Sequence, residues 1–152
     1  MYKLLIVWYN YYNSKAKHTK LFIDNRRRTN MGKFVVSEVK TGVKFNLKAN
    51  NGQVIASSQV YKTFKTCMKG INSIKKNAPI AAIEDQTVEE YATAKNPKWE
   101  IYLDKAGEFR FRLKARNGQI ICAGEGYKQM SGCKNGIESI IKNAPDAEVV
   151  KE

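Results

Sequence analysis

The side chains of this sequence that could do chemistry are three cysteines, one histidine and a few carboxylates. Cys67, Cys122 and Cys133 form no CxxC pair, and their odd number indicates reduced thiols rather than a disulfide framework. The one histidine, His18, lies near the N-terminus. Residues 31–152 therefore lack the usual general base at neutral pH and the partner that activates a nucleophilic cysteine. We predict that the protein is not an enzyme and has no catalytic residue.

Metal, cofactor and membrane sites are not expected either. A structural zinc ion takes about four ligands, and three scattered cysteines without a neighbouring histidine do not supply them. Neither a GxxxxGK[ST] loop nor a GxGxxG turn occurs to hold a phosphate-bearing cofactor. No run approaches the roughly 18 apolar residues that a membrane-spanning helix needs. The sequence predicts no metal, no cofactor and a cytoplasmic protein.

Basic residues at alternate positions of two predicted strands form the candidate binding surface. Alternation places them on one face of each strand, opposite the apolar residues. A basic sheet face with an aromatic side chain can follow a phosphate backbone and stack a base. The alternative is a solvated face whose cations pair with Glu100 and Asp104 and prevent aggregation. The candidate residues for binding an anion or a nucleic acid are Lys44, Lys48, Tyr102, Arg110, Arg112 and Lys114.

The strands and helices that must position these residues are encoded by an internal sequence repeat. From Val43 to Pro79, a shift of 66 positions gives 19 identical residues in 37. Each copy predicts three strands, a helix and a short strand, because apolar residues first alternate and then follow helical spacing. In the second copy the helical stripe is Cys133, Ile137, Ile140 and Ala144.

Two local sequence features add detail to the predicted strands and helices. The dipeptides Asn51-Gly52 and Asn117-Gly118 predict two-residue type I′ turns, which would place Leu113 opposite Cys122 and Ala115 opposite Ile120. Cys122 then faces the core as a small buried residue. Gly70 and Gly136 lie inside the helices and indicate a close approach, which we expect between the two helices.

The second copy also resembles a known family. The pattern W-E-I-Y-x-D-x-x-G-x-F-R-F-R-L-K-A-x-N-G-Q-I-I, then G-Y and a helix with N-G-I-E-S ending in K-N-A-P, is similar to that of the YegP family of small bacterial proteins. The resemblance extends over residues 33–152 and is weaker in the first copy, where Glu38 replaces Leu103 and Val43 replaces Phe109. It implies β3-α-β units, present as a tandem repeat or as a dimer of single units, in which the final strand of each unit swaps into a sheet shared with the other. It implies no catalytic residue, because the family has no established activity.

The predicted fold class is therefore α+β. Tandem duplicated β3-α-β units share one antiparallel sheet, with two helices packed on one face and the C-terminal strands swapped between units. The units span residues 31–86 and 97–152, with a linker at 87–96, and form one fused domain. Because the duplication supplies an internal pseudo-dimer, we expect a monomer.

Residues 1–30 match neither unit and form a basic leader. They hold seven Lys or Arg and one Asp, a net charge of +6 out of the +13 of the whole chain. We expect that Met31 is the real start and that the leader is upstream sequence read in frame. The alternatives are a disordered basic arm that folds against an anionic partner and a segment docked on the sheet edge.

The function class that remains is a non-enzymatic binding, accessory or protein-interaction module with an unknown partner. The alternative is a weak, sequence-independent binder of RNA or single-stranded DNA that uses the basic outer sheet face. The overall basic surplus favours anions in general but selects no partner.

Overall fold

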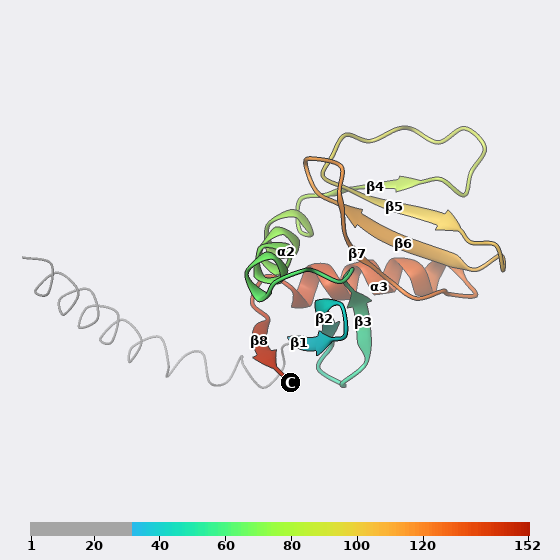
Figure 1. Ribbon diagram of the computed structural model, residues 1–152. Coiled ribbons are helices and arrows are strands. Elements are labelled where there is room, and N and C mark those ends of the chain that lie inside the picture. The colour runs from blue at the N-terminus through green and yellow to red at the C-terminus, as the bar shows by residue number, and fades with distance from the viewer. Residues whose placement is uncertain (1–31) are drawn as a thin grey trace, which may run out of the picture. The chain divides into compact units, whose positions relative to one another are not determined.

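The computed structural model describes residues 32–152, so the predictions for the leader lie outside the described residues. It is an α+β fold in which one mixed sheet of eight strands is combined with two helices (Figure 1). The elements in chain order are β1 (Lys33–Val39), β2 (Gly42–Lys48), β3 (Val54–Ser57), α2 (Phe64–Asn77), β4 (Ala82–Asp85), β5 (Lys98–Leu103), β6 (Phe109–Lys114), β7 (Ile120–Ala123), α3 (Met130–Asn143) and β8 (Glu148–Lys151).

The strand order of the sheet is β4-β5-β6-β7-β3-β2-β1-β8. The six inner strands pair antiparallel, whereas β4 pairs parallel with β5 and β8 pairs parallel with β1. The expectation of a purely antiparallel sheet is therefore wrong at its two edges. Each edge strand follows a helix, and the helical crossover lets the chain enter its new neighbour in the parallel direction.

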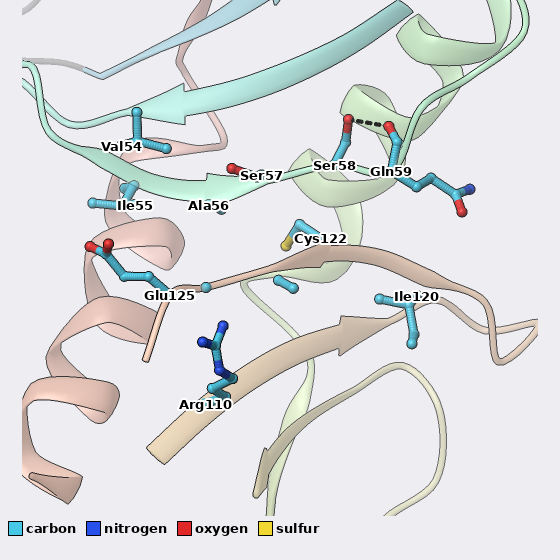
Figure 2. Close-up of a pocket in the computed structure, with 12 residues that line it drawn as sticks. Val54, Ile55, Ala56, Ser57, Ser58, Gln59, Arg110, Ile120, Cys122 and Glu125 are labelled. Atoms are coloured by element: carbon cyan, nitrogen blue, oxygen red, sulfur yellow. Dashed lines mark hydrogen bonds between the residues drawn. The ribbon is translucent and has the colours of Figure 1, made fainter. Parts of the chain in front are cut away.

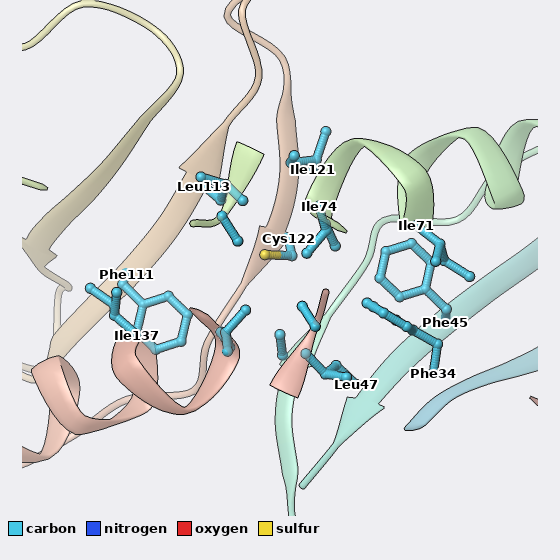
Figure 3. Close-up of a cluster of buried hydrophobic side chains, with 14 of the residues drawn as sticks. Phe34, Phe45, Leu47, Ile71, Ile74, Phe111, Leu113, Ile121, Cys122 and Ile137 are labelled. Atoms are coloured by element: carbon cyan, nitrogen blue, oxygen red, sulfur yellow. The ribbon is translucent and has the colours of Figure 1, made fainter. Parts of the chain in front are cut away.

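One hydrophobic core joins the sheet to both helices. Phe45 and Leu47 of β2 and Phe111 and Leu113 of β6 are fully buried, as the alternation of apolar residues predicts. Ile74 of α2 and Ile137 of α3 enter the same cluster (Figure 3). Among the described residues, neither helix is long and apolar enough to cross a lipid bilayer.

The two hairpin loops differ from the predicted type I′ turn. Leu113 lies opposite Cys122 as expected, but Ala115 pairs with Gln119 rather than with Ile120. Gly118 has a φ of 80°, and no residue other than glycine has a positive φ in the described part of the chain. The Gly118 amide donates to the Ala115 carbonyl, which makes a three-residue loop with a glycine bulge. The Asn117 side chain accepts from the Gln119 amide, so asparagine stabilises this loop through its side chain.

The glycines inside the helices make room for tyrosine rings. A Cβ added at Gly70 would lie 2.3 Å from Oη of Tyr61, and one added at Gly136 would lie 2.6 Å from Oη of Tyr127. Each tyrosine belongs to the segment that leads into its own helix. The expectation that the two helices approach each other at these glycines is wrong, because the tyrosine preceding each helix occupies that space.

Candidate functional site

The predicted basic surface on β6 is present, but its cations are paired. Nε of Arg110 lies 2.6 Å from Oδ2 of Asp104, and Nζ of Lys114 lies 2.9 Å from Oε1 of Glu100. Arg112 forms an ion pair with the other oxygen of Glu100. The hydrogen bond from Arg110, followed by backbone amide donors, holds the pKa of Asp104 below its ordinary value. The charge pairing that the sequence offered as an alternative is thus realised in the second half.

Glu100 is the centre of a buried charge cluster that we define as Glu84, Lys98, Glu100, Arg112 and Lys114. Both glutamates are nearly inaccessible, with 2% and 1% of their surfaces exposed. Nζ of Lys98 lies between them, 2.7 Å from Oε2 of Glu84 and 3.1 Å from Oε1 of Glu100. β4 delivers Glu84 to this place because its parallel pairing puts Glu84 beside Glu100.

The two glutamates of the charge cluster are ionised near neutral pH. Hydrogen bonds from Lys98, and then from Gln86, lower the pKa of Glu84 to about 2. Burial acts to raise the pKa of Glu100, but hydrogen bonds from Lys114, Arg112 and Lys98 outweigh it and leave that pKa below its ordinary value. The partner Glu84 is also the main reason that the pKa of Lys98 is raised. The glutamates of the cluster are therefore held as ion-pair partners, rather than poised to exchange protons as general acids or bases near neutral pH.

The remaining predicted site residues fall into two places. The Arg112 guanidinium lies 4.8 Å from the ring centroid of Tyr102, so this ring is already in contact with a cation. Lys44 and Lys48 lie on β2, which β7 and β3 separate from β6 by about 14 Å at normal strand spacing. The structure thus brings Tyr102 and the three β6 cations together and leaves the two lysines of β2 apart.

Sequence reasoning missed the roles of Lys98 and Glu84. Both lie at the ends of predicted elements, and no local pattern shows that they meet. The signal that could have found them is a comparison of the two halves, because the positions matching Glu100 and Glu84 are occupied by Val35 and Val150. Because two glutamates stand where the other half has two paired valines, this comparison indicates that buried ion pairs replace an apolar contact.

The three cysteines are buried and unreactive in character. Burial raises the pKa of Cys122 to about 12 and that of Cys133 to about 11, and it also raises the pKa of Cys67. The expectation that Cys122 is a small buried core residue is confirmed, with 1% of its surface exposed. In residues 32–152, no group of three or more histidine, cysteine or acidic side chains is arranged to hold a metal ion.

A groove of about 570 Å³ opens at the middle of the sheet, between β3 and β7. The two strands pair with each other at Ser57 and Ala123 alone, so most of their facing edges is not joined by strand pairing. Figure 2 shows residues of β3 along one wall and residues of β7 along the other, with Arg110 beside them. Val54 and Ile120 are exposed apolar side chains of this central groove. It combines strand edges with apolar walls, a combination suited to an extended ligand.

A second groove, of about 700 Å³, lies between α2 and the hairpin that joins β6 to β7. We call it the α2 groove. Its charged side chains are Lys69 and Lys76 of the helix and Arg116 of the hairpin, and no acidic residue lines it. Sequence reasoning did not identify it, because the helix and the hairpin come from different halves of the chain.

Comparisons with known proteins agree with the fold. The family model "Domain of unknown function (DUF1508)" matches the chain twice, at residues 40–85 and 104–150. The UPF0339 protein YegP of Yersinia pestis is 35% identical over 114 residues, which cover 74% of this chain and 88% of that protein. A UPF0339 protein of Stutzerimonas stutzeri, encoded in the 5′ region of the ptx operon, is 75% identical over 48 residues; these are 32% of this chain and only 43% of that relative.

A solved structure supports the same relationship. The solution structure of YegP from E. coli, a protein of unknown function, superposes with a TM-score of 0.67 at 28% identity. The match covers 80% of this chain and 93% of that one. The sheet and its two helices are thus shared with a protein whose own activity is not known.

Proposed function

Because the chain belongs to the DUF1508 family of domains of unknown function, we propose a role from its surface: it is a non-enzymatic, cytoplasmic module that binds another protein. The partner contributes an extended segment, which lies in the central groove. The observation that carries this proposal is the single residue pair, Ser57 with Ala123, that joins the facing edges of β3 and β7.

Strand edges are suited to this role. An extended segment can form main-chain hydrogen bonds with a free strand edge and place alternate side chains in neighbouring pockets. The central groove offers two such edges, together with the apolar side chains Val54, Ile55 and Ile120 for contact. Gln59 near one end and Glu125 near the other add polar groups that can select among segments (Figure 2).

We further infer that the two repeats form an internal pseudo-dimer and that the protein is a monomer. Ser57 and Ala123 are 66 positions apart, the spacing of the two copies, so their pair lies where an approximate twofold axis would cross the sheet. The pairing of β4 with β5 and of β8 with β1 supports an exchange of final strands between the repeats.

The second candidate function is weak nucleic-acid binding by the basic outer sheet face. Lys44 supports it, because this lysine forms no ion pair with another residue of 32–152. The ion pairs of Arg110, Arg112 and Lys114 with acidic residues favour the protein-interaction module instead. Changing these three cations to alanine should therefore reduce folding stability more than affinity for a polynucleotide.

The proposal can be tested with a displayed library of short peptides selected against the full chain. A selected peptide should slow hydrogen exchange at residues 54–57 and 120–123, because it pairs with those strand edges. Ala123→Arg or Ser57→Arg should abolish binding by filling the groove, whereas Ala106→Arg in the exposed β5–β6 loop should not. Failure to select any peptide, or protection confined to other strands, would refute the proposal.

A further inference from the structure

The α2 groove gathers positive charge without neighbouring acids. It is lined by Lys69 and Lys76 of α2 and by Arg116 at the tip of the β6–β7 hairpin. Within residues 32–152, no ion pair is recorded for any of these three side chains, in contrast to the paired cations of β6. Asn72 and Asn117 also line it and can donate hydrogen bonds to an anionic oxygen.

The positive charge continues along the helix. Lys65, in the first turn of α2, is exposed and lies one helical turn before Lys69, and Lys62 is an exposed lysine just before the helix. From Lys65 to Lys76 the row is about 16 Å long at the rise of an α-helix. A single phosphate group cannot contact a row of this length, whereas a linear chain of phosphates can.

The start of α2 carries charge of the sign that a helix does not favour. The first turn contains no acidic residue but does contain Lys65, beside the positive end of the helix dipole. Lys65 therefore adds positive charge at one end of the row, although α3 also begins without an acidic residue.

The other half of the molecule provides an internal comparison. At a shift of 66 positions, Lys69 and Asn72 become Asn135 and Glu138 on α3, and Arg116 corresponds to Asn50. The fold therefore does not require a cation at positions 69 and 116, whereas Lys76 is matched by Lys142 on α3. Residues 32–83 hold nine lysines and one glutamate, a net charge of +8, whereas residues 84–152 hold eleven basic and twelve acidic residues, a net charge of −1.

From these observations we propose that the α2 groove binds the phosphate backbone of a single-stranded nucleic acid. This goes beyond the proposed protein-binding function, because it uses a different class of partner, and it places nucleic-acid binding on a different surface from the outer sheet face. Phosphate contacts from lysine and arginine carry no sequence information by themselves. The groove contains no aromatic side chain on which a base could stack, so binding is sequence-independent and strongly dependent on salt.

The test is a titration of the full chain with fluorescently labelled oligouridylate at several salt concentrations. The variant Lys69→Gln, Lys76→Gln, Arg116→Gln should bind about tenfold more weakly at low salt. The slope of log affinity against log salt should become shallower by about 2, since each phosphate contact on a single strand contributes about 0.7. Thermal unfolding of the variant should match that of the native protein, because the three side chains are at the surface.

The control removes three charges elsewhere. Lys40→Gln, Lys105→Gln, Lys134→Gln changes the net charge equally at exposed positions outside the groove. Equal weakening of both variants would show that net charge alone governs binding. Absence of binding by the native protein, or binding that neither variant alters, would show that the groove is not the binding site. Each of these results overturns the proposal. So would displacement of the oligouridylate by inorganic phosphate at equal phosphate concentration, which would indicate a site for one phosphate.

Discussion

Replacing Lys98 by methionine tests whether the buried charge cluster stabilises the fold. Methionine has a similar volume and shape, so the change removes the charge without opening a large cavity. It deletes the contacts of 2.7 Å to Glu84 and 3.1 Å to Glu100. Two carboxylates on neighbouring strands then face each other with one cation fewer between them.

The expected loss follows from the contacts that remain. Removing one partner of a buried ion pair costs about 3–5 kcal/mol of the free energy of unfolding. Glu84 keeps hydrogen bonds of 2.7 Å from the Gln86 side chain and from the Ala94 amide, and Glu100 keeps Arg112 and Lys114. We therefore expect the lower end of that range, about 3 kcal/mol. For a domain stable by about 5–15 kcal/mol this is a large fraction.

The loss should depend on pH. The folded pKa of Glu84 is about 2, below its ordinary value of 4.5, so its ionised form stabilises the native protein above pH 4.5. This stabilisation disappears as the pH falls from 4.5 through 2. Without Lys98 the largest cause of the lowered pKa is gone, so the variant has less of this stabilisation to lose. The difference between the proteins should be greatest near neutral pH and smaller at about pH 3.

Urea unfolding of the full chain, followed by circular dichroism at both pH values, measures this difference. The matched control is Lys33→Met, because Lys33 occupies the equivalent position on β1 beside Val35 and pairs with Glu148 across the backbone only. It should change stability by less than about 0.5 kcal/mol. Equal losses in both variants, or a loss at Lys98 that does not change with pH, would refute the reasoning.

Three further changes test the packing. Gly70→Ala should destabilise the protein by about 1–3 kcal/mol despite the better helix propensity of alanine, because the new Cβ would clash with the Tyr61 hydroxyl. Adding Tyr61→Phe to this variant should restore part of the lost stability in thermal unfolding. If it restores none, the contact between Gly70 and Tyr61 is contradicted. Gly118→Ala should cost about 1 kcal/mol in urea unfolding through its positive φ alone, since no atom would clash with the new Cβ; an unchanged midpoint would contradict the bulged loop. Cys122, with a pKa raised to about 12, should react with a thiol reagent at neutral pH only at the rate of unfolding, and rapid labelling of the native protein would show that it is accessible.

The parts of the fold that depend on local pattern were predictable from the sequence. Alternating apolar residues identify β6, and the spacing of Cys133, Ile137 and Ile140 identifies the buried face of α3. The hairpin loops were located correctly but given the wrong geometry, because an Asn-Gly pair suits both a two-residue turn and a three-residue loop with a bulge. The sequence fragment alone does not decide between them.

The parts that depend on distant segments were not predictable in the same way. The parallel direction of β4 and β8 is decided by where each helix ends, and a four-residue strand carries no pattern that specifies it. The burial of Glu84 follows from that pairing, and so does its contact with Lys98. The α2 groove likewise exists only because a hairpin of one half lies beside the helix of the other.

Comparison of the two halves of the chain shows which residues the fold requires and which can vary without changing the fold. At buried positions they are similar, with Cys67, Ile71 and Ile74 of α2 matched by the same residue types on α3. At exposed positions of the same helices they differ in charge, with lysine at 69 and asparagine at 135. Since the same backbone is built in both halves, the stability of the fold does not explain Lys69, although Lys76 is matched by Lys142 of α3. A surface role explains Lys69, and the α2 groove is where that role can be measured.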